Sequence, residues 1–237
     1  MFCPEWPFLK SRKEIDATRI GAIGHSEGGI VGPLAASRSR DLAFVVLLAG
    51  PGVPLDQVLY KQAELITRSA GASDAAIARN RQIQELVIGA LKSEEDPKAS
   101  AAKIREGWDK MKASLPSAER EQMDAVLNRQ IQQFNTPEIR STLRYDPAGT
   151  LRKLKIPVLA MNGSRDLQVS AQQNLPAIAD ALSAGDNPDF TVTELPGLNH
   201  LFQRCKQCTL AEYGSLEETF SPAALEILGN WISRHAH

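Results

Sequence analysis

The sequence is poor in several features that would assign a chain of 237 residues to a particular class. It has three cysteines, 5% aromatic residues and a formal net charge of −1. A small, odd number of cysteines is not the pattern of a disulfide-stabilised secreted domain, so it favours the cytosol while leaving the compartment open. The balanced charge offers no basic surface for nucleic acid or for an anionic membrane, and we expect neither as a partner.

Long hydrophobic runs are also missing. No apolar stretch approaches the roughly 18 residues that a membrane-spanning helix needs. The opening MFCPEWPF has two prolines and no basic segment ahead of an apolar stretch, so no signal peptide is visible. A chain of 237 residues is long enough for one substantial core with a modest insertion.

Cys205 and Cys208 form a single C-x-x-C pair. A redox dithiol would normally open a helix after a strand, and a zinc site would need further ligands from elsewhere. A local disulfide is the third possibility. We favour a fourth, two loop cysteines without a role, and we expect neither a metal nor a cofactor.

Short apolar segments separated by helical ones predict a parallel sheet. The expected strands are 19–24, 42–49, 156–161 and 190–195. The helices that we expect to pack on this sheet are 28–37, 176–182 and 222–231. For the last of these we expect Ser221 as the N-cap and Pro222 at the first helical position, which is a recognised start signal.

The region 55–150 has a different character, because its apolar residues recur at helical spacing and strand signals are scarce. Asp96 before Pro97 and Thr136 before Pro137 predict two helix starts there. We therefore expect an α/β fold with about four parallel strands and flanking helices. Its segments are core residues 1–54, a helical insertion at 55–150, and core residues 151–237.

The segment 19–29, RIGAIGHSEGG, contains a G-x-S-x-G motif centred on Ser26. In a nucleophile elbow the serine sits at the tip of a strand-to-helix turn with φ > 0, where side chains two positions away would collide. We therefore expect glycine to be sterically required at both Gly24 and Gly28. The alternative is an ordinary glycine-rich turn with no chemistry.

A serine nucleophile needs a base that removes its proton, and histidine is the usual one. The chain has four histidines. His25 is adjacent to Ser26 and is expected to face away, and His235 and His237 close the chain. His200 remains, in the loop PGLNHLF that follows the last expected strand.

The base in turn needs a third group that fixes its tautomer. Asp166 lies in NGSRDLQV, which follows the third expected strand and opens with turn residues. The alternative role for Asp166 is that of a structural aspartate that caps a turn.

Three segments resemble the α/β-hydrolases, in the esterase branch close to serine aminopeptidase-like and dienelactone-hydrolase-like proteins: IDATRIGAIGHSEGG, LRKLKIPVLAMNGSRDLQV and LPGLNHLFQ. The chain order Ser26, Asp166, His200 is that of this superfamily. The resemblance implies hydrolysis of small acyl esters and implies that the helical insertion is the family's cap. In the implied mechanism the backbone N–H of Glu27 is one oxyanion donor, and the side chains of His25 and Glu27 flank the substrate site.

The family's earlier strands, and the loop with its second oxyanion donor, have no counterpart ahead of Ser26. The strand at 19–24 is then expected to have an open apolar edge. We favour a truncated hydrolase over a homo-oligomer in which a second chain covers that edge. Weak or absent esterase activity follows, because loss of one oxyanion donor lowers the rate about a hundred- to a thousandfold.

Two other functions stay open at this point. One is a serine peptidase or acyl-aminopeptidase that uses the same three residues on amides. The other is an inactive hydrolase remnant that serves as an interaction protein.

Overall fold

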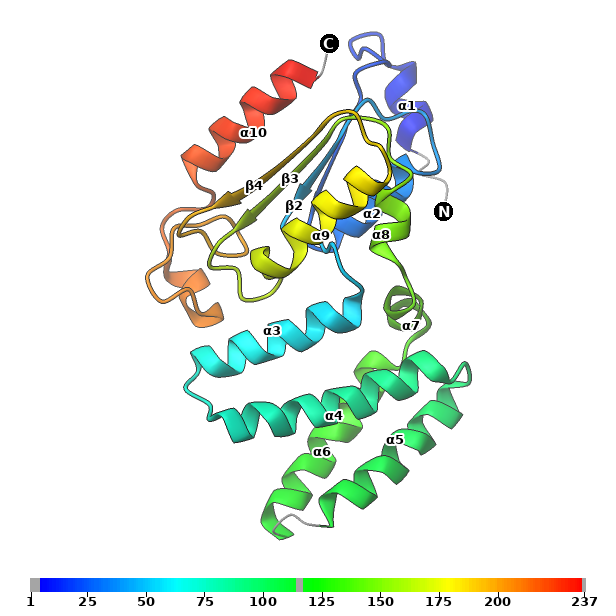
Figure 1. Cartoon of the computed structure of the whole chain (residues 1–237), viewed down its shortest axis with the longest axis vertical. Helices are drawn as coiled ribbons and strands as arrows, with labels where there is room; N and C mark the ends of the chain where they lie inside the picture. The colour runs from blue at the N-terminus through cyan, green and yellow to red at the C-terminus, as the bar shows by residue number, and fades with distance from the viewer. Residues whose placement is uncertain (1–4, 114–116, 236–237) are drawn as a thin grey trace. The chain divides into compact units, whose positions relative to one another are not determined.

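The structure of the chain is a computed structural model that describes residues 5–113 and 117–235. It falls into two units, which are described separately below (Figure 1). The first unit comprises Met1–Val53 together with Asp146–His237, and the second is Pro54–Tyr145.

The first unit is built on a four-stranded parallel sheet in the order β1-β2-β3-β4. The strands are β1 Ala22–His25, β2 Val45–Leu48, β3 Val158–Gly163 and β4 Phe190–Leu195. All four expected strands are present, although β1 begins later than predicted. Every residue of β2 and β3 is buried, as near-continuous apolar runs predict for strands covered on both faces.

Helices cover both faces of this sheet (Figure 1). They are α1 Glu5–Ser11, α2 Gly28–Ala36, α8 Pro147–Leu151, α9 Ala171–Ala184, the 3-10 helix η1 Leu210–Ser215, and α10 Pro222–His235. Successive β2 side chains point to opposite faces. Leu47 therefore packs in one cluster with Ile178 of α9, while Val46 packs in another with Trp231 of α10.

Helix α9 begins at Ala171, earlier than the predicted start at Pro176. Proline inside a helix removes one backbone hydrogen bond and is unfavourable by about 3 kcal/mol. The turn that precedes it buries Ala171, Asn174 and Leu175 against the core, and this burial offsets the penalty.

The second unit is entirely helical in its described part. It contains α3 Leu55–Ser69, α4 Asp74–Ser93, α5 Pro97–Lys112, α6 Ser117–Phe134 and α7 Pro137–Leu143. Both predicted start signals are confirmed, because the side chain of Asp96 accepts from the N–H groups that open α5 and that of Thr136 accepts from the N–H of Ile139.

This helical unit has a core of its own, with Leu91, Ile104 and Trp108 among its buried residues. It also has an apolar pocket of about 300 Å³ that is open to solvent on one side and is lined by side chains of α3, α4, α6 and α7. The unit ends at Tyr145 rather than at the predicted residue 150, because α8 belongs to the first unit, with Ala148 packed against its core. None of the helices within residues 5–113 and 117–235 has the length and apolar character needed to cross a membrane.

Candidate active site

Ser26 joins the end of β1 to the start of α2 in a conformation that is rare for a residue with a side chain. Its φ is 55°, in the left-handed region, and such a position is unfavourable by about 1–3 kcal/mol. Two backbone hydrogen bonds hold it there. The N–H of Ser26 donates to the carbonyl of Leu48 at 2.9 Å, and the N–H of Gly29 donates to the carbonyl of Ser26 at 2.9 Å.

The glycines around Ser26 are required by sterics at one of the two expected positions. A Cβ on Gly24 would lie 2.0 Å from the carbonyl oxygen of Gly28. Gly28 is different, because apart from its chain neighbours and the backbone of its own helix no described atom lies within 4 Å of a Cβ built on it, so the expectation for this glycine is wrong. The second constrained glycine is Gly29, whose Cβ would lie 2.4 Å from the Cα of Gly50. Helix α2 packs against the chain that leaves β2 at that point.

Asp166 and His200 are joined by a buried hydrogen bond. Nδ1 of His200 lies 2.8 Å from Oδ2 of Asp166, and their side chains are 5% and 0% exposed. Asp166 follows β3 and His200 follows β4, so both lie at the edge of the sheet where the parallel strands end. With its Nδ1–H donated to a carboxylate, the imidazole presents Nε2 as the basic nitrogen.

The carboxylate of Asp166 also caps its own turn. Its Oδ1 accepts from the backbone N–H groups of Gln168 at 2.7 Å and Val169 at 2.9 Å. The two roles weighed for this residue therefore coexist, because one oxygen shapes the loop and the other holds the imidazole. A carboxylate fixed in this way orients its histidine partner more rigidly than a freely rotating one.

His25 lies closer to the candidate site than the sequence suggested. Its ring centroid is 4.7 Å from that of His200, and its Nε2 donates to the backbone carbonyl of His200 at 2.9 Å. The expectation that His25 faces away from the site is therefore wrong. The reason is that the loop after β4 returns over the end of β1, where the imidazole of His25 packs against it.

Ser26 is the candidate residue that the structure does not join to the others. Among the described residues, no hydrogen bond links the hydroxyl of Ser26 to His200, and Nε2 of His200 has no partner. The backbone N–H of Glu27 likewise donates to no described group.

Sequence reasoning missed the residues that shape the loop around His200. Asn199 is fully buried, and its Oδ1 accepts from the N–H groups of Leu201 at 2.9 Å and Gln203 at 3.0 Å. Its Nδ2 donates to Oε1 of Gln203 at 3.0 Å. An asparagine next to a glycine-containing turn is a known signal for such local hydrogen bonds, so Asn199 could have been found from the sequence.

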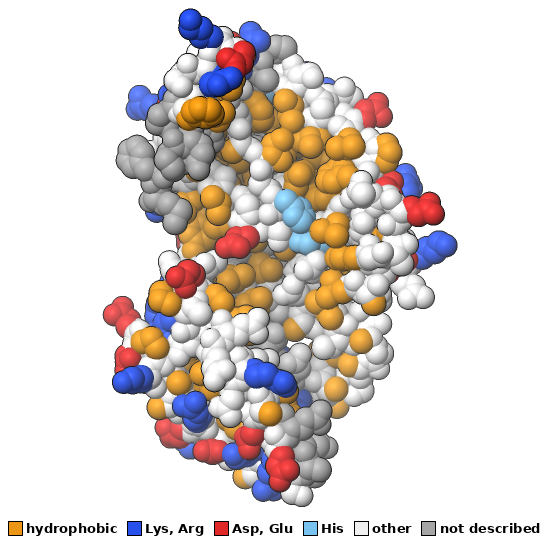
Figure 2. Space-filling model, turned by 180° about the vertical axis from the view of Figure 1, so that it is seen from behind, with side chains coloured by type: hydrophobic (Ala, Val, Ile, Leu, Met, Phe, Trp, Pro, Cys, Tyr) orange, Lys and Arg blue, Asp and Glu red, His pale blue; other side chains and the backbone are white. Residues whose placement is uncertain are grey.

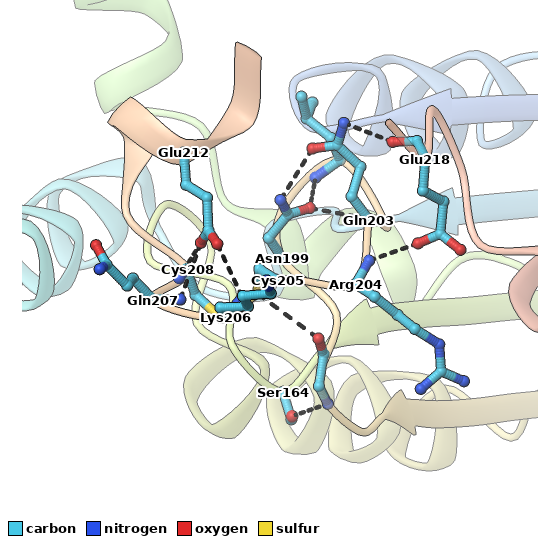
Figure 3. The surroundings of a disulfide bond; sticks show 12 residues. Ser164, Asn199, Gln203, Arg204, Cys205, Lys206, Gln207, Cys208, Glu212 and Glu218 are labelled. Atoms are coloured by element: carbon cyan, nitrogen blue, oxygen red, sulfur yellow. Dashed lines mark hydrogen bonds between the residues drawn. A yellow bond between two sulfur atoms is a disulfide. The ribbon is translucent and has the colours of Figure 1, made fainter. Parts of the chain in front are cut away.

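The two loop cysteines form a disulfide, Cys205–Cys208, which corrects the interpretation that they have no role. The carboxylate of Glu212 accepts from the N–H groups of Lys206, Gln207 and Cys208 at 2.9, 3.0 and 2.6 Å (Figure 3). These bonds, led by that of Lys206, hold the pKa of Glu212 below its ordinary value. A small odd cysteine count gives no information about such a local pair.

Side-chain clusters that could hold a metal ion and exposed apolar side chains bear on cofactors and partners. Within the described residues, no group of three or more His, Cys, Asp or Glu side chains is placed to hold a metal ion. Hydrophobic side chains gather in patches on the face seen in Figure 2, with histidine side chains among them. At the open edge of β1, Ile23 is 52% exposed, and Val31 of α2 is 55% exposed.

Known proteins resemble this chain in sequence and in structure. No family model matches the chain. Esterase EstD of Thermotoga maritima is 28% identical over 193 residues, which is 81% of this chain but 37% of that protein. The chain therefore spans little more than a third of the curated relative it matches.

The solved structures with similar folds are more distant in sequence. An esterase of Pyrococcus furiosus, Pf2001, is 17% identical, with 98% of this chain and 59% of that chain covered at a TM-score of 0.48. Esterase RhEst1 of Rhodococcus sp. ECU1013 is 18% identical, with 92% and 67% covered at a TM-score of 0.42. With its four-stranded parallel sheet, its serine between strand and helix, and its similarity in sequence to an esterase, the chain has a partial α/β-hydrolase fold.

Proposed function

We propose that this chain carries the catalytic residues of a serine carboxylesterase. Ser26 is the nucleophile, His200 the general base and Asp166 the group that orients His200. The observation that carries the proposal is the buried Asp166–His200 hydrogen bond of 2.8 Å, on loops that follow β3 and β4. Ser26, with its positive φ, follows β1 of the same parallel sheet.

The chemistry follows from the tautomer that Asp166 imposes. The hydroxyl of Ser26 attacks the ester carbonyl while Nε2 of His200 takes its proton, and the negative Asp166 stabilises the resulting imidazolium. The N–H of Glu27 donates to the oxyanion at the start of α2. His200 then protonates the leaving alcohol, and the same base activates the water that hydrolyses the acyl-enzyme.

The proposed substrate is a small acyl ester. Similarity to a curated esterase supports an ester over an amide, but that protein is much longer than the matched segment, so its activity is carried over only as a proposal. We propose that the helical unit acts as the family's cap and limits which acyl groups are hydrolysed.

A second candidate is a non-catalytic hydrolase whose exposed strand edge pairs with another copy of the chain. The observation in its favour is that β1 is an edge strand with 52% of Ile23 exposed. An exposed edge strand presents unpaired backbone N–H and C=O groups to which a second chain can hydrogen-bond. In this case the first unit would serve for association between copies of the chain.

Covalent labelling with a fluorophosphonate separates the two candidates. The proposed esterase should take up the label, and Ser26→Ala should abolish it. Ser37→Ala is the matched control, because Ser37 is half-buried with its hydroxyl bonded to the carbonyl of Leu34 and should leave labelling intact. Absence of any Ser26-dependent label would leave only the non-catalytic candidate. Short aryl esters compared with aminoacyl anilides then distinguish esterase from peptidase.

A further inference from the structure

The loop that carries His200 does not end at the candidate site. After His200 the chain passes through the Cys205–Cys208 turn, enters η1 and returns toward the site at Tyr213. The amide of Gln168 donates to the phenol oxygen of Tyr213 at 3.4 Å, and the backbone N–H of His200 lies near enough to this oxygen to lower the pKa of the phenol. Tyr213 therefore contacts the loop of Asp166 and lies near the loop of His200.

Gln168 gives this contact a direct connection to the carboxylate. Its backbone N–H donates to Oδ1 of Asp166 at 2.7 Å, while its side chain reaches Tyr213. A chain of hydrogen bonds results, which runs from Tyr213 through Gln168 and Asp166 to the imidazole of His200. Burial, in the first place, and the nearby carboxylate of Asp166 raise the pKa of Tyr213, so its phenol stays neutral where an esterase works.

The disulfide turn fixes the place from which Tyr213 reaches this chain of hydrogen bonds. The backbone groups of residues 206–208 all donate to the carboxylate of Glu212, the residue immediately before Tyr213 (Figure 3). Cys208 is 2% exposed, so one end of the turn is anchored in the unit. The disulfide holds these N–H groups together, and through Glu212 they hold the start of η1.

We propose that Tyr213 is a positioning residue for the Asp166–His200 pair, held in place by the Cys205–Cys208 turn. This inference rests on the proposed function, because it assigns Tyr213 to the same site. Reduction of the disulfide by a dithiol breaks the S–S bond and yields two thiols, with two electrons and two protons supplied as the dithiol closes its own disulfide. The loosened turn then releases Tyr213, and the imidazole of His200 loses part of its support.

The test follows the Nδ1–H proton of His200 by NMR in the full chain, because this signal reports the hydrogen bond to Asp166 without requiring turnover. Tyr213→Phe keeps the ring and removes the hydroxyl. Gln168→Leu removes the same bond from its other end. Tyr60→Phe is the matched control, because Tyr60 lies in α3 of the helical unit.

Loss of the hydroxyl should speed exchange of the His200 proton with solvent about three- to tenfold, the effect of one neutral hydrogen bond. Gln168→Leu and treatment with dithiothreitol should each have a similar effect, and Tyr60→Phe none. Reduction should add nothing in the Tyr213→Phe variant, because both changes release the same contact.

The inference is overturned if Tyr213→Phe exchanges like the unmodified chain, or if reduction speeds exchange equally with and without the hydroxyl. A chain that lacks Ser26-dependent labelling but shows the predicted exchange changes would refute the proposed function and support the positioning role. Normal labelling with unchanged exchange in all variants would do the reverse.

Discussion

Replacement of Gly24 by alanine tests the elbow geometry directly, because the same change at Gly28 provides a matched control. An alanine Cβ at Gly24 would lie 2.0 Å from the carbonyl oxygen of Gly28 and 2.9 Å from the backbone nitrogen of Gly29. Both are backbone atoms at the start of α2, and neither can rotate away as a side chain could. The turn must therefore deform for the methyl group to fit.

The expected magnitude follows from this rigidity. Insertion of one extra carbon into a packed region destabilises by about 1–3 kcal/mol, and a backbone clash belongs at the upper end. For a protein of this size about 3 kcal/mol lowers the melting temperature by roughly 6–12 °C. At Gly28 the methyl group meets no described atom within 4 Å outside its chain neighbours and the backbone of its own helix, so Gly28→Ala should stabilise the chain by about 0.4–1 kcal/mol through the unfolded state.

Thermal unfolding followed by circular dichroism measures both variants, with hydrogen exchange of the β2 amides as a report on the first unit alone. Gly24→Ala should melt well below the unmodified chain and should lose Ser26-dependent labelling. Gly28→Ala should melt at or slightly above it. Equal shifts for the two variants, or a larger loss at Gly28, would refute the steric account of the elbow.

Three further predictions concern the site and its surroundings. Asp166→Asn should reduce Ser26 labelling by up to about 10⁴-fold, because His200 loses the acceptor that fixes its tautomer, and a rate within tenfold of the unmodified chain would contradict the assigned role. Ile23→Lys should lower any self-association seen by analytical ultracentrifugation, because a charge blocks the edge of β1, whereas Phe8→Lys on α1, where Phe8 is 60% exposed, should have less effect. The lowered pKa of Glu212 stabilises the turn at 206–208 above the carboxyl's unfolded pKa, and this stabilisation is lost as pH falls through the folded pKa. The amide shifts of 206–208 should therefore change in acid, below the ordinary glutamate pKa of about 4.3, and should not titrate there in Glu212→Gln.

The layer structure could be predicted from local pattern because the two central strands, β2 and β3, are nearly continuous apolar runs. A strand that is buried on both faces needs apolar side chains at every position, so β2 and β3 can be recognised from the sequence without knowledge of the tertiary structure. The helix starts at Asp96 and Thr136 could also be predicted, because the hydrogen bonds of an N-cap residue, and the proline that follows it, all lie within one turn of the chain.

The details that depend on close approach between distant segments could not be predicted. Whether glycine is needed at Gly28 or Gly29 is decided by the path of the chain at Gly50, which no local motif encodes. The position of His25 depends on where the loop after β4 returns. The contact between Gln168 and Tyr213 joins residues 45 positions apart, and no spacing rule pairs them.

A crystal structure of the full chain after reaction with a fluorophosphonate would test the central claim most directly. The account predicts a phosphonyl group on the hydroxyl oxygen of Ser26, with Nε2 of His200 within hydrogen-bond distance of that oxygen, at about 3 Å. It also predicts that the Asp166–His200 bond is retained. A phosphonylated residue other than Ser26, or an imidazole of His200 that remains beyond reach of Ser26 in the labelled protein, would contradict it.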